Sequence, residues 1–134
     1  MVRIIDASVA IKWFVQEAGR EVALRILADV LAKPRGFAVP HLFYFELTHV
    51  FNRTIPNPSV MHLQLFKQLL TIDIQRFAMT PDLYDATREF QQLGLSGYDA
   101  AYVALARLTK GRWLTFDYKA HERIAHLGFS ESLG

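Results

Sequence analysis

A short apolar segment leads into a helix-capping residue, Ser8, in Val2-Arg-Ile-Ile-Asp6-Ala-Ser8. Residues 2–6 predict a buried strand that ends at Asp6, and Ser8 predicts a helical turn directly after it. The same change from strand to helix recurs along the chain. We expect further short strands at residues 37–39, 73–77 and 113–115, and a weak strand at an edge that opens at residues 128–129.

Helical patterns separate these segments. We expect helices at residues 19–33, 41–53, 60–70, 80–93, 98–109 and 118–126. Strands that alternate with helices favour a parallel sheet with helices on both faces. The sequence therefore predicts the α/β class: a three-layer α/β/α domain with a central, mainly parallel sheet of four to five strands. One domain covers residues 1–134, since no linker, repeat or low-complexity segment interrupts it.

Composition excludes several classes of protein. Apolar residues make up 51% of the 134 residues, far too many for a disordered chain. Apolar runs are much shorter than the roughly 20 residues that span a membrane, and Asp6 interrupts the first one too early for a signal peptide. We therefore expect a cytoplasmic protein without a membrane partner. The absence of cysteine excludes disulfides, thiolate nucleophiles and iron–sulfur ligation.

Four acidic residues lie inside or at the edge of apolar runs, where a lone carboxylate is costly to bury. They are Asp6, Glu46, Asp99 and Asp117. Sites in parallel sheets form outside the carboxyl ends of the strands, and all four acids are placed to reach one such edge. Carboxylate oxygens suit a hard divalent cation, so the four predict a shared metal site.

Each acid also has a purely structural interpretation. Asp6 could form an Asx-turn after its strand, and Asp117 could cap the helix that follows. Ser96 and Asp99 have the spacing of a capping box, although that motif prefers Glu or Gln at its last position.

Glu46 could pair with His49 or Arg53 on the same side of its helix. An acid within Phe-Tyr-Phe-Glu-Leu is harder to explain by packing, which favours a functional role for Glu46. A zinc-binding helix is excluded, because the spacing of His121 and His126 places their rings about 140° apart on a helix.

Four segments together resemble the PIN-domain family, and within it the VapC-type ribonuclease toxins. They are Ile4-Ile-Asp6-Ala-Ser8-Val-Ala-Ile-Lys12-Trp-Phe14, Val39-Pro40 leading to Phe45-Glu46-Leu47, Leu95-Ser-Gly-Tyr-Asp99-Ala-Ala-Tyr102-Val-Ala-Leu-Ala106, and Trp113-Leu-Thr115-Phe-Asp117. Their order and spacing cover nearly the whole chain, and it is the set rather than any single motif that carries the resemblance.

The resemblance implies a nuclease whose acids bind Mg²⁺ or Mn²⁺. By position, the catalytic and metal-binding residues are Asp6, Glu46, Asp99 and Asp117. Thr115 or Ser8 is expected to support an acid, or a water on the ion, by a hydrogen bond. Two positions depart from the family pattern: His49 replaces a frequent Asn, and Tyr118-Lys119 replaces a further acid, which weakens the case for a full second metal.

Weaker signals concern the substrate. Net charge is +2. A mildly positive surface around an acidic pit would suit a polyanionic substrate, but the same charge is also that of an ordinary protein surface. Lys12, Arg53, Arg112 and Lys119 are candidate contacts to RNA phosphates. Trp13 or Tyr118 could stack on a base, but core packing is the favoured interpretation of Trp13.

The sequence thus predicts a Mg²⁺-dependent endoribonuclease that cleaves RNA phosphodiester bonds, as the toxin of a toxin–antitoxin pair. The alternatives are a non-catalytic RNA-binding or regulatory PIN module, and a PIN nuclease that processes RNA or acts on DNA. The resemblance implies an antitoxin partner and a homodimer. Helices 41–53 and 60–70 either supply the dimer surface or pack inward.

Overall fold

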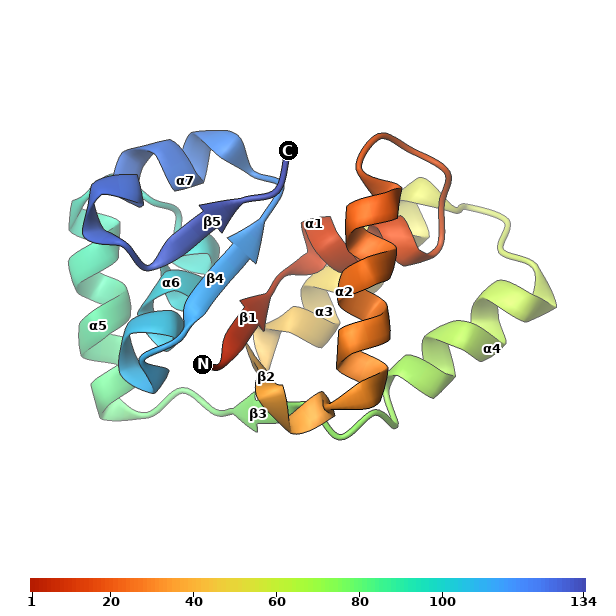
Figure 1. Cartoon of the computed structure of the whole chain (residues 1–134), viewed down its shortest axis with the longest axis horizontal. Coiled ribbons are helices and arrows are strands. Elements are labelled where there is room, and N and C mark those ends of the chain that lie inside the picture. Colours follow the sequence, from red (N-terminus) through yellow and green to blue (C-terminus); the bar gives the residue numbers. More distant parts are fainter.

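The computed structural model describes residues 1–134 and contains one five-stranded sheet (Figure 1). The strands are β1 Arg3–Ile5, β2 Phe37–Pro40, β3 Gln75–Phe77, β4 Arg112–Thr115 and β5 Ser130–Ser132. Their spatial order is β3-β2-β1-β4-β5, and every neighbouring pair is parallel. The predicted parallel sheet is confirmed, with β1 at its centre.

Seven α-helices surround the sheet in a three-layer α/β/α arrangement. They are α1 Ala7–Ala10, α2 Arg20–Ala32, α3 Leu42–Thr54, α4 Val60–Leu69, α5 Pro81–Gln92, α6 Gly97–Thr109 and α7 Tyr118–Ile124, with short 3₁₀ turns at Ile11–Trp13, Pro34–Gly36 and Ala125–Leu127. In Figure 1, α2 lies on the near side and α6 lies behind the central strands. Helix α6 packs against β1, β2 and β4, and α5 covers α6 in turn.

The core is continuous across the sheet. Ile4 and Ile5 of β1 are completely buried, and the residues of α6 from Ala100 to Ala106 are all buried beneath the central strands. A helix that is apolar on every side fits this position between the sheet and α5. None of the helices combines the length and the apolarity that crossing a membrane requires.

The structure refines two expectations. The edge strand expected to open at residues 128–129 is present as β5 but begins at Ser130, because Gly128 ends the preceding 3₁₀ turn with a left-handed φ of 78°. Helix 60–70, expected either to supply a dimer surface or to pack inward, packs inward only in part: Leu69 is buried, but Leu63 and Leu70 are 44% and 39% exposed. Helix α4 projects from the rest of the fold (right side of Figure 1), so only part of its apolar face reaches the core.

The direction and register of the strands place the site. Because β1 and β4 run parallel with Ile5 opposite Leu114, the next residues, Asp6 and Thr115, meet at the same edge of the sheet. This is the carboxyl edge, where parallel sheets form their sites.

Candidate metal centre

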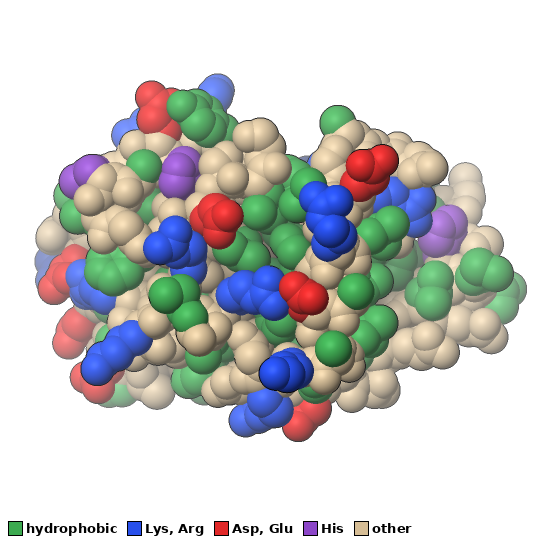
Figure 2. All heavy atoms as spheres, in the orientation of Figure 1, with side chains coloured by type: hydrophobic (Ala, Val, Ile, Leu, Met, Phe, Trp, Pro, Cys, Tyr) green, Lys and Arg blue, Asp and Glu red, His purple; other side chains and the backbone are tan.

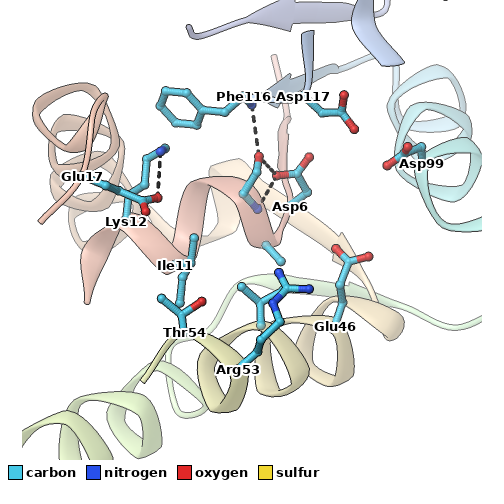
Figure 3. A pocket seen from close by; sticks show the side chains of 13 residues that line it. Asp6, Ile11, Lys12, Glu17, Glu46, Arg53, Thr54, Asp99, Phe116 and Asp117 are labelled. Carbon is cyan, nitrogen blue, oxygen red and sulfur yellow. Dashed lines mark hydrogen bonds and ion pairs between the residues drawn. The ribbon is translucent and has the colours of Figure 1, made fainter. Parts of the chain in front are cut away.

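A pocket of about 400 Å³ opens at the carboxyl edge of β1 and β4 (Figure 3). All four predicted acids line it: Asp6, Glu46, Asp99 and Asp117. They come from four different elements, and in Figure 3 their carboxylates are turned toward the same space. The structure therefore brings together residues that are up to 111 positions apart in the chain.

Asp6 is buried and accepts hydrogen bonds on both carboxylate oxygens. Its Oδ1 accepts from the backbone N–H of Ser8 at 2.9 Å and from the Ser8 hydroxyl at 2.5 Å. Its Oδ2 accepts from the hydroxyl of Thr115 at 2.6 Å and from the indole N–H of Trp113 at 3.0 Å. Asp6, rather than Ser8, caps α1, and its bond from the N–H of Ser8 is that of the Asx-turn considered beforehand, so a structural role and lining the pocket are combined in one side chain.

Ser8 and Thr115 have the supporting geometry expected of them. The Ser8 hydroxyl also accepts from the backbone N–H of Phe116, and the Thr115 hydroxyl accepts from that of Asp117. Each hydroxyl thus points its proton at Asp6, because its oxygen faces a backbone donor. These bonds tie the segment after β4 to the end of β1.

Glu46 makes a different contact from the two considered beforehand. Neither His49 nor Arg53 pairs with it; its Oε1 accepts a hydrogen bond from the hydroxyl of Tyr102 at 3.1 Å. Burial raises the pKa of Tyr102, as does the charge of Glu46, so the phenol keeps its proton and acts as a donor. The backbone N–H of Ala7 also acts on the Glu46 carboxylate and lowers its pKa.

The remaining two acids have fewer hydrogen-bond donors within the protein. Ser96 caps α6 by accepting from the backbone N–H of Asp99, and its hydroxyl is also the one hydrogen-bonding group that lowers the pKa of the Asp99 carboxyl. One oxygen of Asp117 caps α7 by accepting from the backbone N–H of Ala120. Asp99 and the second oxygen of Asp117 are therefore available to a ligand.

The four acids perturb one another electrostatically. Burial, together with the charges of Asp117 and Asp6, raises the pKa of Asp99 to about 6. Burial and the charge of Asp6 likewise raise the pKa of Glu46. For Asp6, burial raises the pKa while the bonds from Ser8, Thr115 and Trp113 oppose the shift.

The donor set fits a hard divalent cation. None of the four acids forms an ion pair with a basic side chain, so the charge of the cluster is not neutralised within the protein. No three histidine or acidic side chains are arranged closely enough to hold an ion directly. Mg²⁺ keeps several waters and takes one or two protein carboxylates, which this spacing accommodates.

The predicted basic contacts separate into two groups. Lys12 and Arg53 line the pocket, although Lys12 is held by Glu17 at 2.9 Å. Arg112 starts β4, at the opposite end of the strand from Thr115, and Lys119 lines a different hollow on α7; neither lines the pocket. On the face in Figure 2, Lys and Arg side chains are interspersed with Asp and Glu rather than gathered in one patch.

Several residues of the site were not singled out from the sequence. Glu17 lines the pocket, and Trp113 and Tyr102 hydrogen-bond its acids from the core. Both side chains are completely buried, and in the sequence Tyr102 and Trp113 look like ordinary core residues. Trp13, in contrast, is buried and donates to the carbonyl of Ala23, which confirms core packing and removes it as a stacking surface.

A second hollow of about 400 Å³ adjoins the pocket and shares Glu46 with it. Leu42, His49 and two exposed aromatic residues, Phe45 and Tyr98, complete its lining. Phe45 is 78% exposed and Tyr98 is 66% exposed, which is unusual for large aromatic side chains. The rim of the pocket therefore carries aromatic surface that the sequence interpretation did not assign.

The fold and the pocket together define a class of protein: a parallel α/β/α domain with a cluster of carboxylates at the carboxyl edge of its sheet. The family model of the PIN domain matches residues 3–127. This chain belongs to the PIN domain family. No curated protein sequence gives a match.

Solved structures share the fold at low sequence identity. A chain of a toxin–antitoxin complex from Klebsiella pneumoniae has a TM-score of 0.71 and 16% identity, with 98% of each chain covered. VapC20 from Mycobacterium tuberculosis, a toxin that cleaves the sarcin–ricin loop, has a TM-score of 0.68 and 18% identity, with 95% of each chain covered. PAE2754 from Pyrobaculum aerophilum has a TM-score of 0.64 and 21% identity, over 92% of this chain and 79% of its own.

Proposed function

We propose that this protein is a divalent-metal-dependent endoribonuclease and the toxin of a toxin–antitoxin pair. The observation that carries the proposal is the shared pocket of Asp6, Glu46, Asp99 and Asp117, whose charge no basic side chain of the protein neutralises. Membership of the PIN domain family and the likeness to toxin structures support it.

A divalent ion in such a pocket supplies charge neutralisation at the phosphate and lowers the pKa of a coordinated water. The acidic side chains of the protein would position the ion, and they differ in how firmly each is held. Asp6 is held in one orientation by four donors, whereas the Asp99 carboxylate has only the Ser96 hydroxyl as a side-chain donor. Asp6 is therefore suited to fix the position of the ion, and Asp99 to adjust to the substrate.

The substrate is a polyanion, so its approach to an acidic pocket needs positive charge nearby. Arg53 is the basic residue best placed for this role, because it lines the pocket without an ion-pair partner. The aromatic rim of Phe45 and Tyr98 supplies flat, exposed surface on which bases of a single strand can stack.

Cleavage by the pure protein tests the proposal. We expect labelled RNA to be cut in the presence of Mg²⁺ or Mn²⁺ and to remain intact with EDTA or with Asp99→Asn. A matched single-stranded DNA distinguishes a nuclease that acts on DNA. Binding of RNA without any cleavage at millimolar Mn²⁺ would support the alternative, a non-catalytic module.

An antitoxin is the partner that this proposal requires. A pocket with surplus negative charge can be closed by an Arg or Lys inserted among the carboxylates. An apolar groove of about 310 Å³ between α2 and α4, lined by Trp13, Phe14, Leu27, Leu31 and Leu65 among others, adds a surface for a protein segment. Growth arrest on expression, relieved by the product of an adjacent reading frame, would support the toxin assignment. Normal growth on expression of a protein that cuts RNA in vitro would refute the toxin assignment and leave the nuclease activity standing.

We also propose a homodimer. Helix α4 exposes Val60 and Met61 at 72% and 68%, and an exposed apolar face of this kind is typical of an interaction surface. Light scattering of the pure protein should give twice the chain mass of 15.4 kDa. A charged substitution such as Met61→Glu should give the single mass if α4 forms the interface.

A further inference from the structure

Two buried aromatic side chains connect the acids of the pocket from below. Tyr102 of α6 donates its hydroxyl proton to Oε1 of Glu46 at 3.1 Å, and Trp113 of β4 donates its indole N–H to Oδ2 of Asp6 at 3.0 Å. The two rings stack on each other, with centroids 6.1 Å apart and planes inclined by 9°. Both side chains are completely buried.

Packing alone does not explain this arrangement. A buried phenol or indole needs a hydrogen-bond partner, and a backbone carbonyl satisfies that need at least cost. Trp13 shows this solution, since its indole N–H donates to the carbonyl of Ala23 at 2.8 Å. Tyr102 and Trp113 instead donate to two different carboxylates, each of them a candidate ligand.

The geometry restricts what each acid can do. Donors on Oδ2 of Asp6 and on Oε1 of Glu46 fix the rotation of both carboxyl groups, because each donor belongs to a rigid, completely buried ring. The two stacked rings form one unit, so the spacing between Asp6, directly after β1, and Glu46 on α3 depends on that unit. Glu46 held in this way lines the pocket beside Asp6.

We propose that Tyr102 and Trp113 act as a positioning pair, which holds Asp6 and Glu46 in the relative orientation that a divalent cation requires. This inference rests on the cation site of the proposed function and deepens it. Neither residue would touch the substrate; each would act through the carboxylate to which it donates. Donors behind a ligand orient it toward the ion, and their loss typically lowers metal affinity about 10- to 100-fold.

Calorimetric titration with Mn²⁺ tests the pair without RNA. Tyr102→Phe and Trp113→Phe remove the donors and keep an aromatic ring in the stack. We expect each variant to bind Mn²⁺ at least about 10-fold more weakly than the wild type. Trp13→Phe is the matched control, since it removes an equally buried indole bond to a carbonyl; it should lower the melting temperature and leave the Mn²⁺ affinity unchanged.

A spectroscopic measurement tests the pair while both of its hydrogen bonds are intact. The chain has two tryptophans, so Trp13→Phe leaves Trp113 as its only one. Mn²⁺ should change the emission of this remaining indole with the same midpoint as the calorimetric curve, because its N–H touches a ligand of the ion.

The outcomes are distinct. Mn²⁺ affinities of Tyr102→Phe and Trp113→Phe within twofold of the wild type would overturn the inference, as would an emission that ignores Mn²⁺, or a wild type that does not bind Mn²⁺. A wild type that binds Mn²⁺ but cuts no RNA would refute the proposed activity alone. In that case the expected loss of Mn²⁺ affinity in both variants would still support the positioning pair.

Discussion

The hydroxyl of Thr115 donates a hydrogen bond of 2.6 Å to Oδ2 of Asp6, across the ends of two neighbouring strands. The parallel register of β1 and β4 creates this contact, because Ile5 lies opposite Leu114 and the next residues meet at the sheet edge. The same hydroxyl accepts from the backbone N–H of Asp117. Thr115 thus links two candidate ligands that come from separate strands.

Replacing Thr115 by Val should therefore weaken metal binding. The substitution keeps the shape of the side chain but leaves the N–H of Asp117 without its acceptor and Asp6 without one donor. We expect Mn²⁺ affinity to fall about 10- to 100-fold, with a loss of about 1–3 kcal/mol in the free energy of unfolding. Calorimetry and denaturant unfolding measure the two effects.

The matched control is Thr87→Val. Thr87 is also buried, and its hydroxyl donates to the carbonyl of Leu83 at 2.7 Å, within α5. This variant should keep the wild-type affinity for Mn²⁺. Equal Mn²⁺ affinities for Thr115→Val and Thr87→Val would show that Thr115 only supports the fold.

Asp6→Asn and Asp99→Asn should both abolish RNA cleavage but differ in stability. Asp6 accepts two N–H groups that cannot reorient, from Ser8 and Trp113, and an amide NH₂ would face at least one of them. We expect Asp6→Asn to lose about 1–3 kcal/mol of unfolding free energy. The Asp99 carboxylate has only the Ser96 hydroxyl as a side-chain donor, and an amide oxygen can accept from that hydroxyl too, so Asp99→Asn should fold normally.

A gel assay with Mn²⁺ and denaturant unfolding check this pair of predictions. Full activity in Asp99→Asn would remove that residue from the mechanism. Equal stabilities for both variants would contradict the hydrogen-bond network described for Asp6.

The sheet and the acidic cluster were predictable because both follow from short-range patterns. Residues 2–6 and 113–115 are apolar segments that end in Asp6 and lead to Asp117, and parallel strand ends must share an edge. The partner of Glu46 was not predictable. Tyr102 lies 56 positions away, and its hydroxyl contact depends on how α6 packs beneath the sheet.

Helix α4 shows a second feature that the sequence could not predict, namely which surface covers an apolar helix face. Its apolar residues predict burial, but periodicity cannot state whether the burying surface belongs to the same chain. The structure leaves Leu63 and Leu65 each 44% exposed. A pattern that reports only apolarity cannot distinguish the core from a protein–protein interface.

The aromatic rim should contribute to RNA binding and not to metal binding. Phe45→Ala and Tyr98→Ala remove exposed rings beside Glu46, and stacking on an aromatic ring is worth about 1–3 kcal/mol per base. We expect weaker binding of single-stranded RNA by about 5- to 100-fold, with unchanged Mn²⁺ affinity. Fluorescence anisotropy with Asp99→Asn as the background measures binding without cleavage.

Tyr84→Ala is the control for the rim, because Tyr84 is similarly exposed, at 56%, but lies on α5 outside the hollow. Its RNA affinity should equal that of the background. A change of molecular mass in Phe45→Ala would instead assign the ring to an interface between two copies of the chain.

The last prediction concerns the metal-free protein and pH. Burial and the charges of Asp117 and Asp6 raise the pKa of Asp99 to about 6 from its usual 3.8, so the folded state holds this proton more tightly than the unfolded chain. The resulting stability is fully present below the unfolded pKa and is lost as pH rises through about 6. Asp99→Asn removes this loss, so without metal it should melt above the wild type at neutral pH and close to it near pH 4.

Mg²⁺ should reverse the order of melting temperatures. The ion binds the folded cluster and hardly the unfolded chain, which stabilises the wild type by about 2.7 kcal/mol at a hundredfold excess over Kd. Asp99→Asn should lose most of this gain, whereas Asp85→Asn, an exposed carboxylate on α5, should behave as the wild type in both conditions. Scanning calorimetry with and without Mg²⁺ at both pH values gives the comparison. Identical Mg²⁺ shifts in the wild type and Asp99→Asn would mean that Asp99 takes no part in binding the ion, and that its raised pKa reflects burial alone.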